Sequence, residues 1–128
     1  MCGILGITEP INDIFFLNNL NKITYRGPDG YGIWQTTEKT VTLGHRRLSI
    51  LDLTDAGKQP LHYEHLTITY NGEIYNFLEI RNELKVNGYH FFSESDTEVI
   101  LAAYLHWGTD CFRKFNGMWA LGIWDDKN

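Results

Sequence analysis

The sequence predicts an α+β domain in which β-sheets are covered by helices. Short apolar runs with β-branched residues are read as strands, and three segments have the spacing of helices. Along the chain the order is strand, helix, strands, helices, strand, which favours layered sheets and helices. With 128 residues, 43% of them hydrophobic and 21% charged, the chain has the size and composition of one folded domain with its own core.

The first half of the chain predicts three strands and one helix. Residues 3–7 (GILGI) form a short apolar run that is typical of a buried strand, and residues 11–23 have helical spacing. The segment 26–30 (RGPDG) is dense in turn residues. Residues 31–53 are read as strands with a turn near Glu38 and Lys39, and residues 54–61 as a loop.

The second half predicts a strand, two helices and a final strand. Residues 66–73 alternate and are expected to end as a strand at Asn71-Gly72, and 75–87 is helical with Gly88 as its stop. A second helix follows Ser95, a predicted N-cap with Glu98 as its capping-box partner. Residues 115–125 are a buried strand. Because a polar turn follows directly, we expect this strand to be one arm of a hairpin and the domain to be incomplete at its C-terminal side.

Composition argues against several classes of function. Eleven basic against sixteen acidic residues give a net charge of -5, which disfavours binding to nucleic acid. The sequence has no apolar run of membrane-spanning length and no signal peptide. Cys2 and Cys111 are too few for a disulfide framework, so we expect reduced thiols and a cytoplasmic protein.

Metal and nucleotide cofactors are not expected in this chain. His62 and His65 form an H-x-x-H pair without a second ligand cluster, so no metal site is predicted. Neither a P-loop nor a dinucleotide fingerprint is present. Cys111 stands beside Phe112 and is most simply a packed thiol.

Five residues suggest chemistry, although each also allows an ordinary structural explanation. Cys2 heads a buried strand and can act as a nucleophile or as a small apolar residue. Asn71 and Gly72 can form a hairpin turn, or offer a side-chain amide and an unhindered N–H to an oxyanion. Arg47 needs an anionic partner if it turns inward. Asp96 opens a helix, where an acid is favoured in any case.

Taken together, seven segments resemble one family. They are MCGILGI, RGPDG, GHRRLSILDL, GKQPL, YNGEIYNF, SDTEVILAAY and FNGMWALGIWD, and they cover the chain from Cys2 to Asp125. In this order they resemble the amino-terminal glutaminase domain of glutamine-hydrolysing asparagine synthetases, which are class II glutamine amidotransferases of the N-terminal-nucleophile hydrolase superfamily. The resemblance implies a four-layer αββα sandwich, truncated here at its C-terminal side.

The resemblance also implies a mechanism. Met1 is removed, and the α-amino group of Cys2, of a kind that titrates near pH 8, activates its own thiol. The thiol attacks the side-chain amide of glutamine, releases ammonia and forms a thioester that water hydrolyses. By position, the family's site maps onto catalytic Cys2, Asn71 and Gly72 and onto substrate-binding Arg47, Leu48, Ile50, Glu73 and Asp96.

The same resemblance sets expectations about the rest of the protein. Residues 1–128 would be an incomplete glutaminase domain, whose partner is a synthetase domain of the same parent chain. ATP and Mg²⁺ are expected only in that synthetase half, which this sequence lacks, and a homodimer is left open. The ammonia acceptor is aspartate or another carboxylate. Hydrolysis of a different amide, or a non-catalytic binding or scaffold module, are the alternatives.

Overall fold

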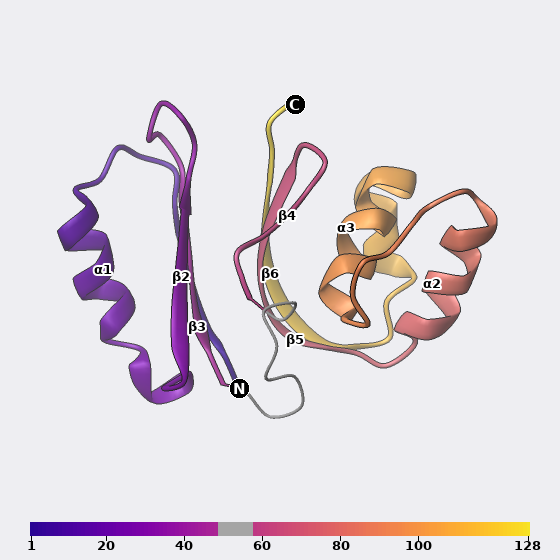
Figure 1. The fold of residues 1–128 in the computed structure, drawn as a ribbon, viewed down its shortest axis with the longest axis horizontal. Coiled ribbons are helices and arrows are strands. Elements are labelled where there is room, and N and C mark those ends of the chain that lie inside the picture. Colours follow the sequence, from indigo (N-terminus) through magenta and orange to yellow (C-terminus); the bar gives the residue numbers. More distant parts are fainter. Residues whose placement is uncertain (49–57) are drawn as a thin grey trace.

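A computed structural model describes residues 1–48 and 58–128. Four layers follow one another in space: helix α1, a first sheet, a second sheet, and helices α2 and α3 together (Figure 1). This arrangement confirms the predicted αββα sandwich. The predictions for residues 49–57, including the end of the strand region and the start of the loop, lie outside the described residues.

The first sheet has three antiparallel strands in the order β1-β3-β2, covered on one face by α1 (Figure 1). The Asn12 side chain caps α1 by accepting the N–H groups of Ile14 and Phe15. Gly44 allows close packing, since a Cβ there would lie 2.8 Å from the Phe16 ring. The elements of this half are β1 (Gly3–Ile7), α1 (Asp13–Asn21), the 3-10 helix η1 (Thr24–Arg26), β2 (Gly30–Gln35) and β3 (Thr42–Arg47).

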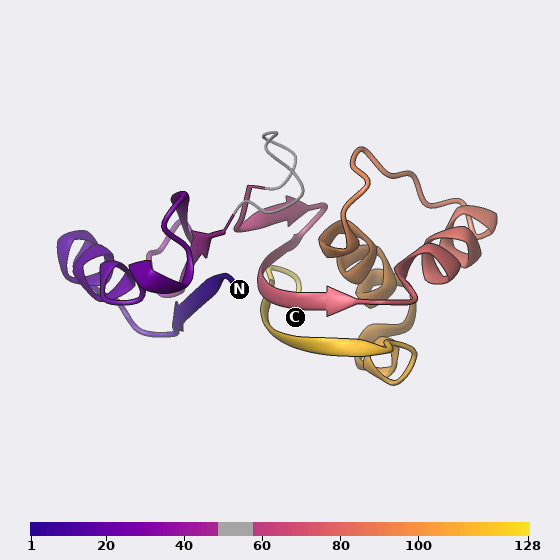
Figure 2. The same cartoon turned by 90° about the horizontal axis from the view of Figure 1, so that it is seen from below.

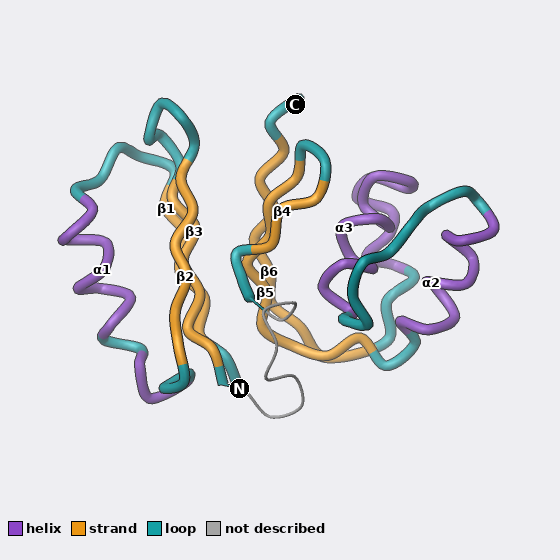
Figure 3. The backbone as a smooth tube through the Cα atoms, in the orientation of Figure 1, coloured by secondary structure: helices purple, strands orange, loops and turns teal. Residues whose placement is uncertain are grey.

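The second sheet has the order β4-β5-β6 and is also antiparallel. Figure 3 shows α2 and α3 grouped on the side of this sheet that faces away from the first one. Between them lies the main apolar core, which includes Leu66, Ile68, Leu84, Ile100 and Leu101. The elements are β4 (Leu61–Tyr63), β5 (Leu66–Ile74), α2 (Phe77–Val86), α3 (Asp96–Trp107), the 3-10 helix η3 (Gly108–Arg113) and β6 (Gly117–Asp125).

Alternation along the strands decides which side chains lie between the sheets. Gly44 faces α1, so its neighbours in β3 point the opposite way, toward the second sheet. Across the gap the Thr69 hydroxyl donates to the Gly44 carbonyl at 3.0 Å, which places the odd-numbered residues of β5 on the face toward the first sheet. The even-numbered residues of β5, including Tyr70, therefore face the helices.

Most predicted elements are confirmed within a few residues, with four corrections. The final strand, predicted to be buried, is β6, in which no residue is fully buried because it lies at the edge of the second sheet. The strand predicted to end at Asn71-Gly72 runs on to Ile74, because β6 pairs with all of it. Strand β4 begins at the end of the predicted loop, and its three residues are too few to show alternation. Only half of the predicted capping box forms: Ser95 accepts the Glu98 N–H, but the Glu98 carboxylate turns to the loop before the helix.

Candidate active site

Cys2 lies at one end of the first sheet, directly before β1, and is partly buried. Gly3 pairs with Arg46 in the sheet register, so the next step brings Cys2 beside Arg47. The Leu48 N–H donates to the Cys2 sulfur at an N–Sγ distance of 3.4 Å. Because Met1 precedes Cys2, the Cys2 nitrogen is part of a peptide bond in this structure. Met1 itself is 72% exposed.

The RGPDG turn fastens this end of the sheet. The Arg26 Nε donates to the Cys2 carbonyl at 3.0 Å, and the Asp29 N–H donates to the Arg47 carbonyl at 3.0 Å. A Cβ on Gly27 would lie 2.6 Å from the Arg47 nitrogen, so only glycine lets the turn approach the strand this closely. The turn therefore fixes the backbone of both Cys2 and Arg47.

Arg46 and Arg47 have opposite surroundings. Arg46 is buried on the α1 side, where its Nε donates to the Gly27 carbonyl at 3.1 Å and its guanidinium lies 5.7 Å from the centre of the Tyr31 ring. Arg47 is half-buried and, by alternation, points into the space between the sheets. Arg47 thus has the inward orientation in which an anionic partner is expected.

His45 shares the inward face with Arg47 and was not singled out in the sequence. It is 1% exposed, and its Nε2 has no hydrogen-bond partner in the described part of the chain. Burial lowers the pKa of His45 from its ordinary value near 6.5 to about 4, with the charge of Arg47 acting in the same direction. The imidazole is therefore neutral at pH 7. Its position two residues before Arg47 in a strand was the available signal.

Asn71 and Gly72 lie side by side in β5, opposite Ala120 and Trp119 of β6. Asn71 is half-buried and points toward the first sheet, whereas a Cβ on Gly72 would lie 2.4 Å from the Met118 carbonyl oxygen. Close approach of the β6 backbone thus requires glycine at position 72.

The N–H of Gly72 points away from β6. Successive backbone N–H groups of a strand point to alternate edges, so the N–H groups of residues 70, 72 and 74 share one edge. The partners of residues 70 and 74 show that this edge is the one opposite β6. The Tyr70 N–H donates there to Gln59 Oε1 at 2.7 Å, and the Ile74 N–H donates to Asp96 Oδ2 at 3.0 Å. By the same alternation Gly72 presents its N–H between these two positions, although it does not end a strand.

Asp96 reaches the same edge of β5 from the first turn of α3. Its Oδ2 accepts the Tyr70 hydroxyl at 2.7 Å as well as the Ile74 N–H. Glu73 is exposed in the adjoining position of β5. Tyr70, the residue that connects Asp96 to the centre of the strand, was not identified in the sequence because a buried tyrosine in a strand looks like ordinary core.

The structure thus gathers the candidate residues in two groups. Strands β1 and β3 pack on β5, and both views place the N-terminal end of the chain beside β5 (Figures 1 and 2). The first sheet contributes one group and the β5 edge the other, while Ile50 lies outside the described residues. The groups are Cys2, Arg47 and Leu48 on one side and Asn71, Gly72, Glu73 and Asp96 on the other.

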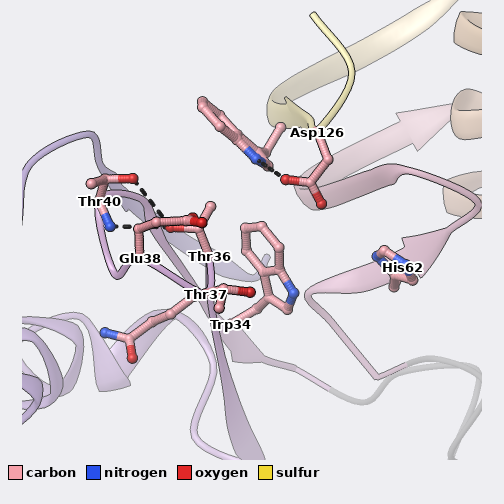
Figure 4. A pocket seen from close by; sticks show the side chains of 9 residues that line it. Trp34, Thr36, Thr37, Glu38, Thr40, His62 and Asp126 are labelled. Atoms are coloured by element: carbon pink, nitrogen blue, oxygen red, sulfur yellow. Dashed lines mark hydrogen bonds between the residues drawn. The ribbon is translucent and has the colours of Figure 1, made fainter.

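A separate hollow of about 470 Å³ lies at the other end of β3 (Figure 4). Trp34, the turn after β2, His62 and Trp124 line it, and the Trp124 Nε1 donates to Asp126 Oδ1 at 2.7 Å. None of the candidate residues borders this hollow, so it is distinct from the candidate site.

Residues 1–48 and 58–128 show neither a metal-binding cluster nor a membrane-spanning helix. These residues contain no group of three or more His, Cys, Asp or Glu side chains that could hold a metal ion. Within the same ranges, no helix combines the length and the apolar character needed to cross a bilayer.

Comparison with known proteins identifies one family over the whole chain. The family model described as "Glutamine amidotransferase domain" matches residues 1–128. The glutamine-hydrolyzing asparagine synthetase 1 of Bacillus subtilis (strain 168) is 41% identical over 137 residues, covering 100% of this chain and 21% of its own length. A putative asparagine synthetase of Methanocaldococcus jannaschii is 40% identical over 148 residues, covering 99% of this chain and 28% of its own length.

Among solved structures, the fold is similar to that of a larger enzyme. The glutamine phosphoribosylpyrophosphate amidotransferase from B. subtilis, complexed with ADP and GMP, superposes with a TM-score of 0.74 at 22% identity. The match covers 97% of this chain and 34% of that one. At this identity the likeness supports the fold alone. This chain spans 21%, 28% and 34% of the length of these three relatives.

Proposed function

Because the chain belongs to the family of glutamine amidotransferase domains, we propose that it hydrolyses the side-chain amide of glutamine to glutamate and ammonia. The family match over all 128 residues carries this proposal. The geometry supports it, since Cys2 directly precedes β1, a strand that packs on β5, and its sulfur accepts a hydrogen bond from the Leu48 N–H.

In the proposed mechanism, removal of Met1 frees the α-amino group of Cys2. That amine accepts the thiol proton, and the sulfur attacks the amide carbon of glutamine. The negative charge that develops on the amide oxygen is stabilised by the Gly72 N–H and the Asn71 side-chain amide. The amine returns its proton to the leaving nitrogen, ammonia departs, and water hydrolyses the thioester to release glutamate.

Recognition of the amino acid portion of glutamine uses charges on both sheets. Arg47 would bind the α-carboxylate, for which a bidentate guanidinium is suited. Asp96 and Glu73 would accept the α-ammonium group, and backbone groups of Leu48 and Ile50 would add contacts. One cation and separated acids match a zwitterion, so simple amides would be poor substrates.

For the whole protein we propose that this chain belongs to the glutaminase domain of an ATP- and Mg²⁺-dependent cytoplasmic asparagine synthetase. The ammonia would pass to a synthetase half and amidate aspartate. The relatives named asparagine synthetase support this assignment. Amidase chry2 of Gibberella zeae is 36% identical over 111 residues, covering 85% of this chain and 16% of its own length, and its name supports hydrolysis of a different amide as the second candidate function.

Replacing each cysteine in turn tests the nucleophile. Cys2→Ala should abolish glutamate release from glutamine but leave glutamine binding measurable by calorimetry, because no recognition contact is removed. Cys111→Ala is the matched control. Cys111 is fully buried, and burial raises the pKa of its thiol to about 12, so its loss should leave turnover in place. Substantial turnover by the Cys2→Ala protein would refute the mechanism.

A further inference from the structure

Tyr70 is a buried residue in the middle of β5 whose hydroxyl reaches the candidate site. Its side chain is 3% exposed and belongs to the core between the second sheet and the helices. The hydroxyl donates a hydrogen bond of 2.7 Å to Asp96 Oδ2. A bond between a neutral hydroxyl and a carboxylate is stronger than one between neutral groups.

The two oxygens of Asp96 have different surroundings. Oδ2 accepts both the Tyr70 hydroxyl and the Ile74 N–H, at 2.7 and 3.0 Å. No hydrogen bond to Oδ1 is found among residues 1–48 and 58–128. A carboxylate with one oxygen fixed by two donors keeps the other oxygen available to accept a further donor in a defined direction.

The Tyr70 hydroxyl remains a donor over the working pH range. Burial, followed by the negative charge of Asp96, raises the pKa of Tyr70 far above its ordinary value near 10. The phenol therefore stays protonated. The hydroxyl keeps this proton in its hydrogen bond to Asp96 Oδ2.

We propose that Tyr70 is a positioning residue that acts through Asp96, orienting its free oxygen toward the α-ammonium group of the substrate; this rests on the proposed function. Asp96 is the first residue of α3, where its side chain could otherwise adopt several rotamers. The Tyr70 and Ile74 donors select one orientation. The ring and the backbone of Tyr70 serve the core and Gln59, so the oxygen atom alone carries the positioning role.

Kinetics with two substrates test this role in the full protein. We expect Tyr70→Phe to raise KM for glutamine about tenfold with kcat changed less than twofold, as expected when ground-state and transition-state binding are lost equally. For 5-amino-5-oxopentanoate, which is glutamine without its α-amino group, kcat/KM should not change. Equal losses for both substrates, or no loss for glutamine, would overturn the proposal.

Tyr63→Phe is the matched control. Tyr63 lies in the same core, and its hydroxyl donates to the His90 carbonyl at 3.1 Å, away from Asp96. The substitution deletes the same atom, with its hydrogen bond to a neutral carbonyl, from the same core and should leave both substrates unaffected. If Tyr63→Phe raised the glutamine KM as much as Tyr70→Phe does, the effect would be one of core stability and the positioning role would be refuted.

Binding measurements separate this proposal from the proposed function. In the Cys2→Ala background, calorimetry should show that Tyr70→Phe raises the Kd for glutamine about tenfold. When Asp96→Asn is already present, adding Tyr70→Phe should raise the Kd less than twofold further. Independent, multiplying losses would refute action through Asp96. Failure of the proposed function has another signature: the unmodified protein would neither bind nor hydrolyse glutamine, and the role of Tyr70 would fall with it.

Discussion

Arg46 and Arg47 are adjacent in β3, yet they point to opposite faces of the first sheet. Arg47→Ala should reduce kcat/KM for glutamine by roughly 30- to several-thousand-fold, since truncating one partner of a buried charge pair costs about 2–5 kcal/mol. A simple amide without the α-carboxylate should lose much less. Steady-state assays with both substrates measure the difference.

The neighbouring arginine supplies the control for Arg47. Arg46 bonds Gly27 and lies near Tyr31, so Arg46→Ala should lower the melting temperature without favouring one substrate over the other. Losses of equal size for glutamine and the simple amide in Arg47→Ala would show that Arg47, too, is structural.

His45 should make stability depend on pH. Its pKa is about 4 in the folded protein and near 6.5 in the unfolded chain, so between these values the unfolded state binds more protons. Stability from the neutral imidazole is fully present above about pH 6.5 and declines toward pH 4, with about 2 kcal/mol lost at pH 5. Urea denaturation at pH 7 and pH 5 measures this loss.

Comparison with His45→Gln isolates the histidine from the carboxylates. The stability of the wild-type protein should fall by about 2 kcal/mol more than that of the variant between pH 7 and pH 5. Parallel decreases in both proteins would mean that His45 is protonated in the fold or that it does not contribute.

At the scale of elements, two glycines in the paired strands β5 and β6 differ in how much space surrounds them. A Cβ on Gly72 would lie 2.4 Å from the Met118 carbonyl oxygen, whereas a Cβ on Gly122 would meet nothing closer than 3.7 Å. Gly72→Ala should therefore destabilise the protein by about 1–3 kcal/mol through overpacking, and Gly122→Ala by much less. Urea denaturation of both variants measures this contrast, and similar stabilities would contradict the strand geometry described here.

Elements with a periodic pattern were predictable, and contacts between elements were not. The strand before Asn71 and the helix after Ser95 follow from alternation and capping, which are local. The continuation of β5 to Ile74 depends on pairing with β6, more than 40 residues away. Glu98 illustrates the same limit: its carboxylate accepts the N–H groups of Phe92 and Ser93, because a loop folds back over it.

The residues of the candidate site also differ in whether the sequence could predict them. Cys2, Arg47 and Asp96 carry functional groups that sequence motifs display directly. The Tyr70 hydroxyl meets Asp96 only because α3 packs beside β5, so no local pattern marked it. For His45 the spacing of two residues from Arg47 in a strand was a signal, but its burial depends on the packing of the two sheets. The motifs thus identify the groups proposed to touch substrate and miss Tyr70, which is proposed to orient one of them.

At the scale of the whole molecule, β6 has β5 as its one strand neighbour in the described part of the chain, and lies along the outside of the second sheet (Figure 2). Met118 is 71% and Trp119 37% exposed in this strand. A long apolar strand with an unpaired edge is prone to pair with other chains. A polypeptide limited to residues 1–128 should therefore self-associate.

Light scattering and thermal melts over a range of concentrations test this expectation. Association through native chains would make the melting temperature rise with concentration. Met118→Lys places a charge on the exposed part of β6, and charged side chains there oppose pairing, so this variant should stay monomeric with a melting temperature independent of concentration. The expectation would be wrong if the wild-type polypeptide were a monodisperse monomer whose melting temperature, like that of the variant, did not depend on concentration. The β6 edge would then already be protected.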